Sequence, residues 1–264
     1  RDIAGAATDI QAAQYVTAQA GGALALRDIS TNDNVTLTAG TTLLARNVVT
    51  QGGTVTATTD SGTATLGNIT THGGDVLVTA GQWADGGALA TLGTVTSSGG
   101  RVEVSGSGIT AVKIDTSATY AGDVVLSYGA TDAAITTVGG LKVNGTLINL
   151  TSTGGGGAGG LTVRATADDH DVTLSGGPAL TAKFVDLWAG RDITGATTDI
   201  VAAQHVTAQA GGALALRDIT TNDNVTLTAG TTLSAGNIGT QGGAVTATAN
   251  GGVVTLGTVT TLGG

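Results

Sequence analysis

The sequence predicts an all-β fold, a right-handed parallel β-helix of about twelve rungs, each of roughly 20 residues. Short apolar and threonine-rich segments recur about every 20 residues, a period typical of solenoid proteins. Residues 1–74 also recur at 191–264, with an offset of 190 and 56 identical positions of 74. The composition agrees with this fold, because 45 glycines, one proline and 2% aromatic residues suit tight corners around a thin aliphatic core.

Each rung begins with a strand of the form apolar-Thr-apolar. In residues 35–39 the apolar Val35, Leu37 and Ala39 alternate with Thr36 and Thr38. Alternation with a period of two indicates a strand with one buried face. The expected rungs follow a partial rung at 1–14 and are 15–33, 34–53, 54–74, 75–100, 101–122, 123–140, 141–160, 161–183, 184–204, 205–223, 224–243 and 244–264.

A second short strand and a polar corner complete each rung. In rung 34–53, Leu43 and Ala45 point inward and the corner Arg46-Asn47 follows. A rung of this length cannot bury its apolar side alone, so rungs must stack in register, about 4.8 Å apart. Twelve such layers make a rod of roughly 58 Å. Right-handed winding follows from the general handedness of parallel crossovers.

An antiparallel sandwich is the main alternative, since it also contains many short strands and turns. It does not require residues 19 to 21 apart to match, and here they do. No linker or change of composition divides the chain, so residues 1–264 are expected to form one continuous domain. The ends carry no polar capping rung, which predicts that the chain is a segment of a longer repetitive protein.

Charge and composition exclude several classes of function. The formal net charge of −9 argues against nucleic acid, whose binding depends on cationic side chains that neutralise phosphates. No apolar run approaches 18 residues, so no membrane-spanning helix is expected. The absence of cysteine fits a cytosolic protein and also an exported one that carries no disulfides.

Three phrases carry a family resemblance: GGALALRDI at 21–29, VTLTAG at 35–40 and GRDI at 190–193. They resemble the repeats of filamentous-haemagglutinin-type exoproteins, which are large bacterial adhesins, many of them exported by two-partner secretion. The resemblance covers nearly the whole chain. It implies a right-handed β-helix shaft that is secreted to the bacterial surface. It also implies adhesion or biofilm formation, with a glycan or protein on a host or neighbouring cell as the partner.

Aspartate and asparagine recur at the corners of successive rungs. Their side chains hydrogen-bond to nearby backbone and tolerate left-handed backbone angles. A structural ladder is therefore preferred to a binding stripe. Its expected members are Asp2, Asp28, Asn47, Asn68, Asp192, Asp218 and Asn237.

The densest polar cluster consists of Asp168, Asp169, His170 and Asp171. Carboxylates and an imidazole so close together are potential ligands of a divalent cation. A solvated loop between strands 161–164 and 172–174 explains the same residues, and it is the preferred interpretation. No metal and no cofactor are predicted.

Aromatic residues mark the candidate ligand contacts. Trp83 lies in an apparent insertion at 81–87, where it either contacts a carbohydrate or protein or folds back as a lid over a groove. Tyr120 and Tyr128 lie in the middle rungs, where the repeat is least regular. If the chain recognises a ligand, residues 75–170 are expected to do so rather than the two similar flanks.

Outward threonines form rows, and regular threonine rows on a flat face can match an ice lattice. Threonine is also simply a good strand residue, and Gln19 and Leu77 interrupt the rows. The threonines in these rows are Thr17, Thr36, Thr38, Thr56 and Thr58.

Catalysis has little support, because the chain has a single glutamate, Glu103, and no nucleophile paired with a base.

Together these features predict a non-enzymatic protein, the shaft of a secreted bacterial surface adhesin or extracellular fibre. A carbohydrate- or ice-binding β-helix is the alternative, and a polysaccharide-degrading enzyme is less favoured. End-to-end stacking of chains is a further expectation, because unpaired strand edges at the ends of a solenoid can pair with another copy.

Overall fold

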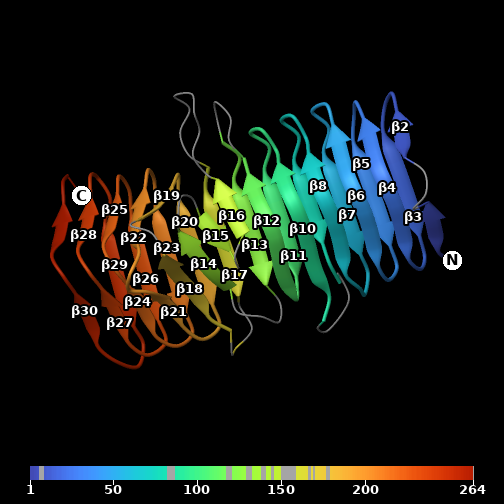
Figure 1. Ribbon diagram of the computed structural model, residues 1–264. Coiled ribbons are helices and arrows are strands. Elements are labelled where there is room, and N and C mark those ends of the chain that lie inside the picture. Colours follow the sequence, from blue (N-terminus) through green and yellow to red (C-terminus); the bar gives the residue numbers. More distant parts are fainter. Residues whose placement is uncertain are drawn as a thin grey trace.

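The protein is a stack of flattened coils, shown from blue to red along the chain in Figure 1. The computed structural model describes residues 1–5, 9–81, 87–116, 121–128, 133–137, 141–143, 146–149, 159–165, 168, 170–176 and 179–263. Within these ranges every regular element is a strand, and nearly all strand pairs are parallel. The prediction of an all-β parallel β-helix is confirmed.

Sheet B is the most regular wall of the solenoid, with eleven strands among the described residues. Each coil contributes one strand to it, and the strands follow the order of the chain. The strands are β3 (Val16–Ala20), β5 (Val35–Ala39), β7 (Val55–Thr59), β9 (Val76–Thr79), β11 (Val102–Gly106), β13 (Val124–Tyr128), β17 (Leu161–Ala165), β20 (Val185–Ala189), β23 (Val206–Ala210), β26 (Val225–Ala229) and β29 (Val245–Ala249).

Two further sheets, A and C, form the remaining walls and contain fifteen and five of the described strands. Sheet A contains β1 (Ile3–Gly5), β2 (Ile10–Ala12), β4 (Leu24–Thr31), β6 (Leu43–Thr50), β8 (Ala64–Thr70), β10 (Leu89–Thr96), β12 (Gly108–Asp115), β14 (Ala133–Thr137), β15 (Leu141–Val143), β16 (Thr146–Asn149), β18 (Val172–Gly176), β21 (Ile193–Gly195), β24 (Leu214–Leu216), β27 (Leu233–Ala235) and β30 (Val254–Leu256). Sheet C contains β19 (Ala179–Ala182), β22 (Asp199–Ala202), β25 (Ile219–Thr221), β28 (Ile238–Thr240) and β31 (Val259–Thr261).

Like side chains lie over like in the core. Val16, Val35, Val55 and Val76 are register partners in successive strands of sheet B. Val35, Val55 and Val76 have no exposed surface. The aliphatic core runs continuously through the coils, so each layer is stabilised by burying its apolar side against the next layer.

One coil departs from the repeat and corrects the predicted rung count. Strand β13 pairs directly with β17, so residues 141–160 add no strand to sheet B. Instead β15 runs antiparallel between β14 and β16, within sheet A. Counted in the same way, the eleven described strands of sheet B give a rod of about 53 Å rather than the roughly 58 Å expected for twelve rungs.

The extra strands lengthen one wall relative to the other. From β12 to β18, sheet A makes four strand steps, through β16, β15 and β14. From β11 to β17, sheet B makes only two steps, through β13. The difference is about 10 Å at ordinary strand spacing, so the two walls diverge in the middle of the rod.

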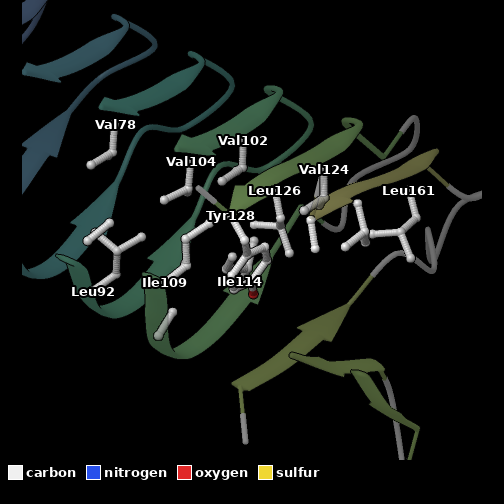
Figure 2. Packing of buried hydrophobic residues seen from close by; sticks show 14 of the residues in the cluster. Val78, Leu92, Val102, Val104, Ile109, Ile114, Val124, Leu126, Tyr128 and Leu161 are labelled. Carbon is white, nitrogen blue, oxygen red and sulfur yellow. The ribbon is translucent and has the colours of Figure 1, made fainter. Parts of the chain in front are cut away.

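Tyr128 is buried in this irregular coil and is 2% exposed. It belongs to the apolar cluster shown in Figure 2. Its register partners in the adjacent coils are the small residues Gly106 and Ala165, which leave room for the ring. The prediction that Tyr128 contacts a ligand at the surface is therefore wrong.

We expect opposite results from two substitutions of Tyr128. Its hydroxyl has no hydrogen-bond partner within the described part of the chain, and burial raises its pKa. Tyr128→Phe should leave the free energy of unfolding unchanged or raise it by about 1 kcal/mol, because it removes an unsatisfied buried group. Tyr128→Ala should lower it by about 3–5 kcal/mol through the cavity left behind. Urea unfolding measures both, and a larger loss in Tyr128→Phe than in Tyr128→Ala would contradict the assignment.

Candidate functional site

Aspartate and asparagine side chains hold adjacent coils together, most of them where the chain passes from one strand to the next and Asn68 within β8. Asn68 accepts the backbone N–H of Thr94 at 3.0 Å, and Asp218 accepts that of Asn237 at 2.7 Å. Asn237 accepts the N–H of Thr258 in turn, at 3.0 Å. The same arrangement recurs at Asp2, Asn34, Asp75, Asp123, Asp171, Asp192 and Asn224. These residues act as structural links between coils.

Asp28 and Asn47 form a different link. Asp28 accepts from Arg46 Nε at 3.0 Å and Nη2 at 2.7 Å, and from Asn47 Nδ2 at 2.8 Å. The side-chain hydrogen bonds from Arg46 are the main cause that lowers the pKa of Asp28. The second copy has Gly236 at the position of Arg46, so this ion pair belongs to the first copy alone.

We expect Arg46→Gly, which installs the residue of the second copy, to raise the pKa of Asp28 toward its ordinary value. In the native protein the lowered pKa stabilises the fold above pH of about 4, and this contribution disappears as the pH falls through the lowered value. Carbon-13 NMR titration of the Asp28 carboxyl measures the change. An unchanged titration curve in the variant would show that Arg46 does not hold this carboxylate in solution.

The cluster at 168–171 is partly described. Asp171 accepts from Arg191 Nε at 2.7 Å and Nη2 at 2.5 Å, and from the backbone N–H of Asp192 at 3.0 Å. The hydrogen bonds from Arg191 lower the pKa of Asp171. The carboxylate thus joins two coils, and in the described residues no three acidic or histidine side chains gather as a metal site. Trp83, Tyr120 and Asp169 lie outside the described residues.

The outer face of sheet B changes along the rod. In the first coils its outward rows contain threonine, with Thr17, Thr36 and Thr56 in one register and Thr38 and Thr58 in the other. Leu77 and Gln19 occupy the same registers, so the threonine rows span few coils. A short array of this kind is consistent with an ordinary soluble strand face.

In the middle of sheet B the outward positions hold charged and aromatic residues instead. Arg164 and Trp188 are register partners, and Asp186 lies opposite Thr162. We call this surface the sheet B patch. Its members are Arg101, Glu103, Asp123, Arg164, Phe184, Asp186, Trp188 and His205.

The patch surrounds a hollow of 310 Å³. Its lining contains Val125 and Thr162, each only 6% exposed although both face outward. Its lining residues are Arg101, Asp123, Val125, Thr162, Arg164, Phe184 and Asp186.

Polar contacts between neighbouring groups order the rim. Arg101 lies 3.0 Å from Glu103, and His205 Nε2 lies 3.2 Å from Asp186. The Asp123 Oδ1 atom accepts the backbone N–H of Gly160 at 2.9 Å. These pairs are partly exposed, so they position side chains more than they stabilise the fold.

Arg164 is placed by an aromatic ring rather than by an acid. Its guanidinium carbon lies 4.7 Å from the centre of the Trp188 ring. Among the described residues it forms no ion pair with a carboxylate. Its outward N–H groups therefore remain available at the rim of the hollow.

A stack of rings closes one side of the hollow. The Phe184 ring is parallel to that of His205, with an interplanar angle of 5° and centroids 5.2 Å apart. The opposite neighbour of Phe184 is Gly160, where a Cβ atom would overlap the Phe184 ring. Glycine at position 160 therefore leaves the space that the Phe184 ring occupies.

Sequence reasoning missed this patch because its members come from five different coils, on or next to β11, β13, β17, β20 and β23, and none stands out in its own segment. Phe184, Trp188 and His205 lie outside the predicted region 75–170. The available signal was the interruption of the threonine rows in the aligned rungs. The single glutamate, Glu103, is paired with Arg101.

A second, larger groove of 630 Å³ runs across β4, β6, β8 and β10. Gly67 and Gly93 leave it open at the corner, and the exposed Leu44 borders it. The groove is mainly lined by backbone and aliphatic atoms, and nothing in the structure shows what would cover it.

The fold is a parallel β-solenoid whose sheet B carries charged and aromatic side chains on its outer face in the middle coils. No known protein family, curated protein or solved structure matches the chain. Within the part of the chain that is described, no helix has the length and apolar character needed to cross a bilayer.

Proposed function

We propose that the chain is the structural shaft of a secreted bacterial surface adhesin or extracellular fibre, and that it serves adhesion, biofilm formation or filament assembly. The observation that supports this proposal best is the continuous register of the coils from β3 to β29. A stack of parallel coils with one unbroken core resists bending and extends in one direction as coils are added.

The long repeat supports the same function. Sheet B of residues 1–190 contains the eight described strands from β3 to β20, so each copy adds about 38 Å of rod. Because residues 191–264 repeat 1–74, joining residue 190 to a new residue 1 reproduces the natural junction. Duplication of this segment therefore lengthens a shaft without creating a new interface.

A series of chains with one, two and three copies of residues 1–190 before the final 191–264 segment tests the proposal. We expect electron microscopy to show straight rods that lengthen by about 38 Å per copy. A matched series with a Gly/Ser linker at each junction should show flexible hinges instead. Compact particles whose length does not grow with copy number would refute the shaft.

The adhesive part of the proposal involves a glycan or protein on a host or neighbouring cell as the partner. Beads coated with the three-copy chain should adhere to target cells more strongly than beads coated with a scrambled-sequence control. Equal retention of both kinds of bead under flow would exclude adhesion by the chain itself and leave only the spacing role.

A further inference from the structure

The hollow of the sheet B patch combines donor-only and acceptor-only groups. Two guanidinium groups, those of Arg101 and Arg164, and two carboxylates, those of Asp123 and Asp186, line the same 310 Å³ space. A guanidinium can only donate hydrogen bonds, and an ionised carboxylate can only accept them. A ligand that satisfies both kinds of group must itself donate and accept.

The formal charges within the lining cancel. The two arginines and two aspartates balance within the lining, and Glu103 beside Arg101 adds a negative charge at the rim, so the hollow has no excess of positive charge that would attract an anion. A phosphate or sulfate would approach Asp123 and Asp186 as well as the arginines, and an amine would approach both arginines. The lining thus favours an uncharged ligand that is rich in hydroxyl groups.

Apolar surface completes the lining. Val125 and the edge of the Phe184 ring offer hydrocarbon contacts beside the charged groups. The hollow is open on the surface of a fully paired sheet, where no free strand edge offers backbone hydrogen bonds to a peptide. Its volume lies at the lower end of the range of small-molecule sites.

The groups that face the hollow are held in place before any ligand binds. Asp123 is fixed by the Gly160 N–H, Asp186 by His205, and Arg164 by the Trp188 ring. Pre-organised polar groups lose little conformational freedom on binding, which favours recognition by hydrogen bonds.

From these features we propose that the sheet B hollow binds an uncharged sugar residue of a glycan. Asp123 and Asp186 accept hydrogen bonds from ligand hydroxyls, and Arg164 donates to hydroxyl or ring oxygens. The C–H groups of the sugar contact Val125 and Phe184. This site is independent of the proposed shaft function, because the solenoid would remain a shaft without it.

The same outward rows contain threonine in later coils, and this suggests the replacement residue for the test. Thr207 and Thr226 follow Asp186 in its row, and Thr228 follows Arg164 two coils beyond Trp188. Arg164→Thr and Asp186→Thr therefore restore the ordinary residue of each row and should preserve the fold. Thr228→Ala changes the same row away from the hollow and is the matched control.

Isothermal titration calorimetry of the full chain would use neutral tetrasaccharides of glucose, mannose, galactose and N-acetylglucosamine, with tetragalacturonate as the anionic probe. We expect at least one neutral probe to bind with a Kd of about 1 mM or tighter. Arg164→Thr and Asp186→Thr should each weaken it about tenfold or more, because each removes a charged hydrogen-bonding group. Thr228→Ala should bind like the native chain.

Circular dichroism and thermal unfolding would first establish that the variants are folded. No heat with any neutral probe would overturn the proposal, as would neutral-sugar binding that survives both hollow substitutions. Preferential binding of tetragalacturonate that is lost in Arg164→Thr but retained in Asp186→Thr would also overturn it in favour of an anion site. Loss of sugar binding in both variants with retention in Thr228→Ala supports it.

Discussion

Val35→Asp is expected to lower the free energy of unfolding by more than about 4 kcal/mol. Val35 has no exposed surface and lies between Val16 and Val55 in the register of sheet B. An aspartate there would place a carboxylate within an aliphatic core where no described side chain can pair with it. Its own coil and the two neighbours should therefore lose their packing together.

Hydrogen exchange with mass spectrometry measures where this loss occurs. Amides of β3, β5 and β7 should lose protection, because each coil is stabilised mainly by the coils that it contacts. Strand β26 carries the same five residues, VTLTA, in the second copy and serves as an internal reference. It should stay protected.

Thr36→Asp provides the matched control, because Thr36 is adjacent in sequence but half-exposed on the outer face. It should change the free energy of unfolding by less than about 1 kcal/mol. A Val35→Asp protein that remains soluble, with an unchanged unfolding midpoint, would be incompatible with a core built from stacked like residues.

The second large effect is expected for Gly230→Ala, which should cost more than about 2 kcal/mol. Gly230 follows β26, and its N–H donates to the Ala210 carbonyl at 3.0 Å. A Cβ atom at this position would overlap the carbonyl oxygen of Gly211 on the preceding coil. Since the obstacle is backbone, neither coil can yield without breaking corner hydrogen bonds.

Gly239→Ala is the matched control in the same part of the rod. Gly239 lies in β28, and nothing lies within 4 Å of the Cβ that alanine would add. Its backbone angles are ordinary, so alanine should be neutral or stabilise by up to about 1 kcal/mol through the unfolded chain. Chemical unfolding of the two variants decides the matter, and equal losses of stability would show that close coil contact at Gly230 is not the cause.

The regular coils could be predicted because their evidence is local and repeated. Strand β5 was predicted from the alternation of Val35 and Leu37 with threonine, and it forms as Val35–Ala39. Some threonines were harder to place. Thr50 and Thr240 point into the core, where each donates to a corner carbonyl, that of Gly53 at 2.5 Å or Gly243 at 2.6 Å. A hydroxyl can thus be buried wherever the corner supplies an acceptor.

Residues 141–160 could not be placed from the pattern. Their strand-like composition suggested another rung, but β15 folds back antiparallel between β14 and β16. Alternation of side chains is the same in parallel and antiparallel strands, so it does not specify the partner. The sheet B patch escaped prediction for a related reason, because its residues meet only once the coils are stacked in register.

The sequence by itself determined that the chain forms stacked parallel coils, because apolar residues at fixed spacing can be buried only against the next repeat. Only the tertiary structure decided where the strands of each coil begin and end and which groups of the neighbouring coil its side chains contact. The segment LALRDI forms one continuous strand in β4, where Asp28 pairs in register with Asn47. The identical residues are divided between β24 and β25 in the second copy, where the Asp218 side chain accepts the Asn237 N–H. The two aspartates also have different partners on the next coil: the Arg46 side chain holds the Asp28 carboxylate in the first copy, whereas Gly236 offers no side chain in the second, and the Asp218 carboxylate accepts a backbone N–H instead.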